Sequence, residues 1–212
     1  YILGSENRQA IDRWHVYVDQ QHQLGKWQLN YGAEYQRSKD HSSQHYAMSD
    51  NPDFDDILSE DVASLYVGTQ RSFDWGLSFN LSAKGEYYHN KYQHNWNFIP
   101  QFGATYYKTP KSIFQLNFNT QRIYPSYWEL HGGTSHINDY STIIGNPKLQ
   151  PYIQYDAQFN YIPRQKYVAT LYFQYGDKAT VQLPYQSPDA LNLIYQTINM
   201  NYKRVVGLNL YA

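Results

Sequence analysis

Two runs of alternating apolar and polar residues, separated by a long polar segment, constrain this chain more than any other feature. In the first, Phe114, Leu116 and Phe118 alternate with Gln and Asn; in the second, residues 153–161 alternate between Ile, Tyr, Ala or Phe and Gln, Asp or Asn. A period of two predicts β-strands with one apolar and one polar face. Two strands of about ten residues flanking one long loop are typical of the outer side of a membrane β-barrel.

Short and long connections alternate along the whole chain, as they do in membrane barrels, which have short periplasmic turns and long outer loops. Short turns are predicted at Gly25, Asp74, Pro110 and Arg164. Long polar loops are predicted over residues 38–59, 125–151 and 177–192, and a shorter loop over residues 90–95. The fold class expected is therefore all-β, an antiparallel up-and-down transmembrane β-barrel. A soluble β-sheet protein is the alternative.

About ten strands are predicted, the last two over residues 193–200 and 204–212. Pro100 lies within the fifth strand and predicts a bulge or irregular pairing there. The residues expected to face lipid are Leu77, Phe79, Leu81, Leu116, Phe118, Ala157, Phe159, Leu171 and Phe173. The residues expected to face the lumen are Asn80, Gln115, Asn117, Gln158 and Gln174.

The composition agrees with a barrel that has a watery interior. The mean hydropathy is −0.74, yet 18% of the residues are aromatic, including 24 Tyr and 5 Trp. A barrel with a polar lumen scores as hydrophilic because every second residue faces water, and Tyr and Trp near strand ends suit the headgroup level. A net charge of −1 argues against a nucleic-acid partner. We interpret residues 1–212 as part of a single barrel domain within a longer chain.

Two motifs resemble a known family. RIYPSYWEL (Arg122 to Leu130) followed by GNPKLQP (Gly145 to Pro151) is similar to paired motifs in the barrels of TonB-dependent receptors, most of all the outer membrane β-barrel branch common in Bacteroidetes. HQLGKWQLNYGAEYQ (His22 to Gln36) also resembles a hairpin of that branch. The motif residues are Arg122, Pro125, Tyr127, Gly145, Asn146, Pro147, Leu149 and Pro151.

This resemblance implies a barrel of 22 strands closed by an N-terminal plug, in the outer membrane of a Gram-negative bacterium. Such receptors import scarce nutrients, such as siderophores, glycans or peptides, with energy relayed by TonB. The plug and other N-terminal regions are expected to lie outside residues 1–212. The partners implied are outer membrane lipid, TonB, the plug and an unidentified nutrient, and no cofactor is implied.

The long loop from Pro125 to Pro151 combines structural and candidate binding residues. Proline after a strand removes a backbone donor, so Pro125 should end the strand, and a glycine at position 145 permits a turn closed to other residues. We interpret the motif residues mainly as fixing where the chain leaves and re-enters the barrel. Aromatic and hydrogen-bonding side chains suited to a ligand are Trp128, His131, His136 and Tyr140.

Other chemistry is poorly supported. His41 and His45 lie near several Asp residues, but the spacing matches no calcium loop, and a solvated acidic loop is the better interpretation. An enzyme within the barrel would need a Ser/His or Asp/His pair on the polar face near the outer rim. We expect no enzyme, and keep a non-transporting surface β-sheet protein as the alternative to a receptor. The isolated chain is expected to self-associate through unpaired edge strands.

Overall fold

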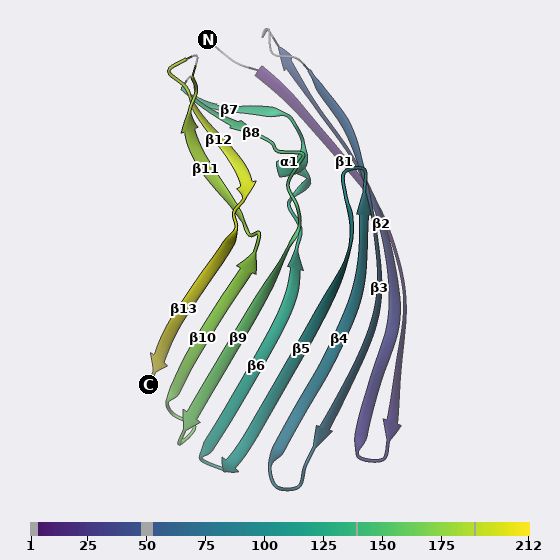
Figure 1. Ribbon diagram of the computed structural model, residues 1–212, viewed down its shortest axis with the longest axis vertical. Helices are drawn as coiled ribbons and strands as arrows, with labels where there is room; N and C mark the ends of the chain where they lie inside the picture. Colours follow the sequence, from purple (N-terminus) through teal and green to yellow (C-terminus); the bar gives the residue numbers. More distant parts are fainter. Residues whose placement is uncertain (1–3, 48–52, 139, 189) are drawn as a thin grey trace.

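A computed structural model of the chain describes residues 4–47, 53–138, 140–188 and 190–212. Its main feature is a curved antiparallel sheet of nine strands (Figure 1). In spatial order these are β1 (Gly4–Leu24), β2 (Trp27–Ala47), β3 (Phe54–Ser72), β4 (Leu77–Asn90), β5 (His94–Thr109), β6 (Ser112–Ile123), β9 (Tyr152–Pro163), β10 (Val168–Asp177) and β13 (Tyr202–Tyr211). The sheet does not close on itself within these residues. The predicted all-β, up-and-down architecture of a barrel wall is confirmed.

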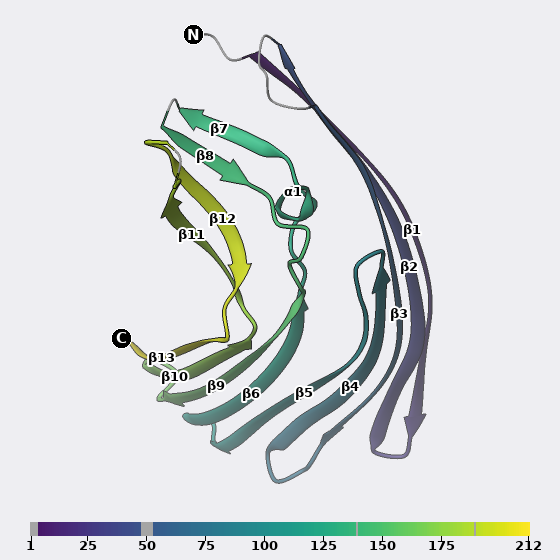
Figure 2. The ribbon, with the colours of Figure 1, turned by 45° about the horizontal axis from the view of Figure 1, so that its top comes forward.

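The chain leaves the large sheet after β6 and after β10, and these two excursions form a second sheet on its concave side (Figure 2). In order, its strands are β11 (Thr180–Gln186), β12 (Leu193–Asn199), β8 (Ser141–Ile144) and β7 (Thr134–Asn138). β12 pairs with β8 in parallel, and the short helix α1 (Tyr127–Leu130) precedes β7. Among the described residues, no helix combines the length and apolar character needed to cross a membrane.

The convex face of the large sheet carries an apolar band because paired residues on neighbouring strands share that face. Phe79 on β4 lies opposite Ala104, which lies opposite Leu116, and Leu116 lies opposite Phe159 on β9. Leu116 and Phe159 are 43% and 41% exposed, and Phe79 and Ala104 are half-buried. The predicted lipid-facing residues all lie on this face: Leu77, Phe79, Leu81, Leu116, Phe118, Ala157, Phe159, Leu171 and Phe173.

The concave face carries amide, hydroxyl and carboxylate side chains that bond across strands. Thr170 Oγ1 donates to Asn160 Oδ1 at 2.7 Å, and Asn160 Nδ2 donates to Gln115 Oε1 at 3.4 Å. Gln174 Nε2 donates to Asp156 Oδ1 at 2.8 Å. The predicted lumen-facing residues, Asn80, Gln115, Asn117, Gln158 and Gln174, all lie on this face. The alternation read from the sequence therefore sorts the two faces correctly.

The short turns lie at one end of the sheet, as predicted. Gly25 begins the two-residue turn between β1 and β2 with a φ of 62°, a left-handed conformation that glycine adopts without strain. After β9, Arg164 and Gln165 have φ values of 56° and 55°, the pattern of a tight hairpin turn with two left-handed residues. These turns match the right-handed twist of the paired strands and leave no long segment at this end.

The long polar segments are more regular than predicted. Residues 38–47 and 54–59, which we assigned to a loop, extend β2 and β3, while residues 48–52 lie outside the described part of the chain. Residues 177–192 contain β11, and residues 193–200 contribute β12 to the small sheet instead of a barrel strand. The large sheet therefore has nine strands where about ten were expected. Beyond a membrane both strand faces meet polar surroundings, so alternation fades although backbone pairing continues.

Pro100 lies where β5 and β6 separate. Pairing between these strands runs from Thr109 only as far as Phe102, opposite Phe118, whereas Pro100 keeps its register against Ala83 on β4. Proline has no N–H to donate, so it suits a strand side that has no partner. Irregular pairing near Pro100 is confirmed, but on the β6 side, and the β4 register shows no bulge. Beyond Phe118, β6 continues with β9 towards α1 (Figure 2).

Neighbouring positions on β6 should respond oppositely to a charge. Leu116→Arg places a cation on the apolar convex face and should cost about 2–4 kcal/mol of folding free energy, because lipid cannot solvate it. Asn117→Arg places the same group on the polar concave face and should be tolerated. The measurement is refolding of the complete barrel into lipid vesicles across a denaturant series. Equal costs for the two variants would contradict the assignment of faces.

The sheet's two edges predict how residues 1–212 behave in isolation. β1 and β13 each lack a partner on one side among the described residues, which leaves rows of unpaired backbone groups. The isolated chain in detergent should therefore pair its edges with another copy, close into a smaller barrel or aggregate. Sedimentation over a range of concentrations measures this. A monodisperse monomer with both edges exchanging amide hydrogens freely is the contrary result.

Candidate functional site

The segment between β6 and β9 folds back onto the concave face of β2, β3 and β4. Its helix α1 begins with a capping box: Glu129 N–H donates to Ser126 Oγ at 3.3 Å, and Ser126 N–H donates to Glu129 Oε2 at 2.9 Å. The cap satisfies backbone donors that a four-residue helix could not satisfy alone. It also directs the residues that follow α1 towards the wall of the sheet.

A small apolar cluster fixes this segment to the wall. Leu58 on β3, Leu130 at the end of α1 and Leu149 of the GNPKLQP motif pack together and are each at most 3% exposed. Tyr127 packs against them, and its hydroxyl donates to Ser38 Oγ on β2 at 2.7 Å. Burying one leucine side chain contributes about 1.5–3 kcal/mol before entropy costs. Motif residues Tyr127 and Leu149 therefore have a packing role.

A buried, hydrogen-bonded Asp–His pair lies beside the cluster. His131 Nε2 is 2.6 Å from Asp40 Oδ2, and the two side chains are 2% and 0% exposed. Asp40 also accepts hydrogen bonds from Gln9 Nε2 at 2.9 Å and Ser42 Oγ at 2.8 Å. Asp56 approaches the other nitrogen of His131 at 3.7 Å. His131, predicted as a ligand contact, thus sits in the contact between segment and wall.

The motif arginine lies in a second polar contact, where β6 leaves β5. Arg122 Nη1 is 3.5 Å from Glu86 Oε1, and Arg122 Nη2 donates to Asn95 Oδ1 at 2.7 Å. Its guanidinium lies over the rings of Tyr88 and Tyr124 at 4.7 and 5.2 Å. Burial, with the hydrogen bond that Tyr124 donates to Glu86, raises the pKa of the Tyr124 phenol. That hydroxyl therefore remains a neutral donor, and Arg122 anchors the departing strand.

Gly145 is required for close approach and not for a left-handed turn, which corrects the reason we gave for it. A Cβ at this position would lie 1.5 Å from the carbonyl oxygen of His131, a distance no side chain can occupy. Beside it, Asn146 N–H donates to Glu129 O at 2.7 Å, and Asn146 Nδ2 donates to Thr197 O at 3.0 Å on β12. The GNPKLQP motif thus joins α1 to the small sheet.

The predicted binding residues are not brought together. Trp128 is 44% exposed and lines three hollows, one of them about 540 Å³ and bordered by Gln9, Arg13 and Tyr124. His136 on β7 and Tyr140 in the turn before β8 have exposed side chains, and the Tyr46 ring meets His136 edge-on at 6.1 Å. Trp128 and His131 share a hollow of about 170 Å³.

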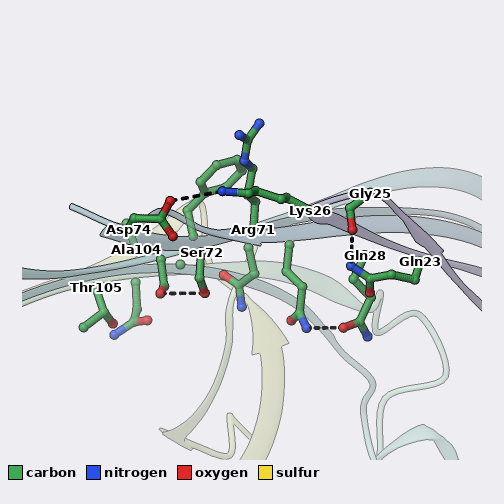
Figure 3. Close-up of a pocket in the computed structure, with 15 residues that line it drawn as sticks. Gln23, Gly25, Lys26, Gln28, Arg71, Ser72, Asp74, Ala104 and Thr105 are labelled. Carbon is green, nitrogen blue, oxygen red and sulfur yellow. Dashed lines mark hydrogen bonds and ion pairs between the residues drawn. The ribbon is translucent and has the colours of Figure 1, made fainter. Parts of the chain in front are cut away.

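A larger hollow, of about 680 Å³, lies at the short-turn end of the sheet (Figure 3). On its polar side, Gln70 Nε2 donates to Gln28 Oε1 at 2.6 Å, and Ser72 and Ser78 share a hydrogen bond of 2.9 Å. Alternation predicts these side chains to face the lumen, but nothing in the sequence marks them as a hollow. Because these polar side chains already hydrogen-bond to one another, we interpret the hollow as part of the polar lumen wall and not as a specific binding site.

The histidines beside the acidic residues form exposed pairs across β2 and β3. His41 Nε2 is 2.8 Å from Asp55, and His45 Nδ1 is 2.7 Å from Asp53. All four side chains are at least half exposed, in agreement with a solvated acidic surface. Within the described residues, no group of three or more His, Cys, Asp or Glu is placed to hold a metal ion.

The buried Asp/His pair lies on the polar face, where an enzymatic barrel would carry its catalytic groups. The Ser42 hydroxyl, however, donates its hydrogen bond to Asp40 and not to the His131 ring. A nucleophilic site needs the hydroxyl on the imidazole and open to substrate. Here serine, aspartate and histidine are at most 5% exposed. The arrangement stabilises the contact between segment and wall and leaves no accessible nucleophile.

The family of the chain follows from this fold and these motifs. The model of the outer membrane protein beta-barrel family matches residues 1–212 in full. The chain belongs to this family, whose members lie in the outer membrane of Gram-negative bacteria. A comparison with curated protein sequences gives no match.

Solved structures share the fold at low sequence identity. The copper transporter OprC has a TM-score of 0.69 and 12% identity over 95% of this chain and 35% of its own. The hemophore receptor HasR of Serratia marcescens, solved with its hemophore HasA and heme, has a TM-score of 0.67 and 13% identity over 99% of this chain and 41% of its own. The ferric enterobactin receptor PfeA of Pseudomonas aeruginosa has a TM-score of 0.63 and 15% identity over 96% of this chain and 33% of its own. This chain thus spans about a third to two fifths of the length of these proteins.

The outer membrane β-barrel family inferred from the sequence is confirmed, and the chain shares its fold with the barrels of these receptors and transporters. The Bacteroidetes branch stays a prediction. At these identities the structures support the fold alone, and the neighbours are receptors and transporters by name.

The buried pair predicts a sharp difference between two aspartates on the β2–β3 hairpin. Asp40→Ala leaves His131 buried without its partner and should destabilise the seated segment by about 3 kcal/mol. Asp55→Ala removes the exposed partner of His41 and should cost less than about 1 kcal/mol. Limited proteolysis at Gly132 and Gly133 in the complete barrel measures segment opening. Equal cleavage rates in the two variants would show that the pair does not hold the segment.

Proposed function

We propose that this chain is a middle-to-late section of the barrel of a TonB-dependent outer membrane receptor that imports a scarce nutrient. The observation that supports this most is the segment between β6 and β9, which is seated on the concave wall by the Leu58 cluster and by the Asp40–His131 pair. A segment held inside the mouth of a polar-lined wall is placed to meet a ligand that enters the lumen. Its contacts are made by side chains of both barrel and segment.

The rest of the machinery is proposed to lie elsewhere in the complete receptor. Residues 1–212 would belong to one barrel domain, and a plug domain and a TonB-contacting segment would complete the transporter. The names of the similar structures include copper, heme and ferric enterobactin. At 10–16% identity these names do not indicate which ligand this chain binds, so the nutrient is proposed only as a small or oligomeric polar molecule.

The candidate ligand contacts divide into two kinds. Trp128 presents an exposed ring at the border of three hollows, which suits stacking on a ring or sugar face. His136 on β7 and Tyr140 in the turn before β8 add exposed hydrogen-bonding groups. His131 is proposed to act through position, because its ring is buried against Asp40 and does not face an open lumen. None of these roles requires a bond to be made or broken.

The alternative is a surface β-sheet protein that binds a ligand without transporting it. The seated segment would then be a fixed binding platform, and dissipating the energy supply of the inner membrane would leave ligand accumulation unchanged. A receptor coupled to TonB would lose accumulation while keeping surface binding. Measuring both quantities in the same cells, before and after adding a protonophore, separates the two functions.

Removing the tip of the segment should separate folding from uptake. Deleting Gly132 to Thr142 removes β7 and part of β8 but touches no strand of the large sheet, so insertion of the complete receptor should be unchanged. Uptake of the nutrient that supports growth of wild-type cells should fall about tenfold or more, because the candidate contacts His136 and Tyr140 are removed. Heat-modifiable migration on a gel checks insertion. Normal uptake with normal insertion would contradict the proposal.

A cysteine at Ser135 tests which side of the membrane the segment occupies. Ser135 lies on β7, at the end of the sheet opposite the short turns, and the chain has no other cysteine. In intact cells a membrane-impermeant maleimide should label it, because long connections of such barrels lie outside. A cysteine at Lys111, in a short turn, is the matched control and should label only after the outer membrane is permeabilised. The reverse pattern would invert the assigned sides.

A further inference from the structure

The convex face carries one cation whose surroundings are unlike those of the other charged groups. Arg71 on β3 lies opposite Trp27 on β2 and Phe79 on β4, so its side chain projects from the apolar face. On β2, β3 and β4, four rows without Asp, Glu, Lys or Arg on that face separate Arg71 from the next charged pair, Arg37 and Asp61. Arg71 therefore lies at the lower border of the apolar band, next to the short turns.

Aromatic rings enclose its guanidinium. The Cζ atom of Arg71 is 4.9 Å from the ring centre of Trp27 and 4.4 Å from that of Phe73, distances at which a cation is attracted to the ring face. Trp27 and Phe73 both meet the ring of Phe79, at 5.7 and 6.0 Å. These three rings hold the guanidinium in place on the outer surface of the barrel. A merely solvated arginine would not need such a support.

The hydrogen-bonding capacity of Arg71 is unused. Nε is buried and has no hydrogen-bond partner, and none of the described residues accepts a hydrogen bond from the guanidinium. The acidic group at this end of the sheet, Asp74, is bound instead by Lys26 Nζ at 3.0 Å (Figure 3). Lys26, Arg71 and Asp74 together leave one positive charge unbalanced. A planar guanidinium matches the oxygens of a phosphate through two parallel hydrogen bonds.

We propose that Arg71, held by Trp27 and Phe73, is a binding site for the phosphate of a phospholipid in the periplasmic leaflet. The leaflet follows from the proposed orientation, in which the short turns face the periplasm. Aromatic residues at this level lie among headgroups, and the acyl chains would continue along the apolar rows that begin with Phe79 and Leu81. The lipid phosphate would thus neutralise a cation that the protein leaves unpaired.

Native mass spectrometry of the complete, delipidated receptor with added dioleoylphosphatidylglycerol tests the site. The wild-type receptor should retain the lipid, and Arg71→Gln should retain about fivefold less, because the charge-assisted bonds are lost. Arg204→Gln is the matched control: Arg204 also projects from the convex face and lies over Tyr202 at 5.1 Å, but near the opposite border. It should retain as much lipid as the wild type. Equal retention by wild type and Arg71→Gln overturns the proposal.

Further arms identify the lipid as the ligand and guard against misfolding. Dioleoylglycerol, which lacks the phosphate, should not be retained, and an excess of inorganic phosphate should not displace the phospholipid; either contrary result overturns the assignment. If Arg71→Gln does not fold, Arg71→Lys keeps the charge without the planar fork and should retain about two- to threefold less lipid than the wild type. Wild-type retention in that variant would overturn the site. Lipid retention is independent of uptake, so failure here and failure of transport are separate results.

Discussion

The structure depends on one constraint: a backbone that passes through lipid must satisfy every N–H and C=O by pairing with its neighbours. The nine strands meet it through an antiparallel register that is nearly unbroken from β1 to β13. Once that register is set, the side-chain period of two assigns every residue to one of two faces. A shift by one residue would send Leu116 into the lumen and Asn117 into lipid, so the pairing and the two-faced wall are a single property.

Alternation allowed the wall to be predicted because it is imposed by the membrane, and it failed where the membrane ends. Phe114 to Phe118 and the rows facing them were assigned correctly, whereas residues 38–47 were assigned to a loop although they continue β2. In that stretch polar residues occupy both faces, since one meets water and the other meets the seated segment. The even positions Ser38, Asp40 and Ser42 are buried, but no apolar signal distinguishes them from their neighbours.

The candidate site was only partly predictable for a related reason. The motif residues were recognised as fixing the path of the segment, and Leu149, Tyr127 and Arg122 do make its contacts. Asp40 and His131 are 91 positions apart, and nothing in a single sequence pairs them. Gly145 was singled out correctly for the wrong reason, because close approach of two backbones and a left-handed turn both leave a glycine in the sequence. Those two causes separate only in three dimensions.

The separation of β5 from β6 bears on how deeply the barrel sits in the membrane. Below Phe102 and Phe118 both strands are paired with each other, and above that level β5 has one row of backbone groups with no strand beside it. Unpaired backbone groups are costly in hydrocarbon, so we expect the hydrocarbon layer to end near this pair of phenylalanines. Trp96 and Phe98, 72% and 65% exposed, then fall among headgroups. The depth at which the barrel sits in its membrane would then depend on where strand pairing ends as well as on the extent of its apolar surface.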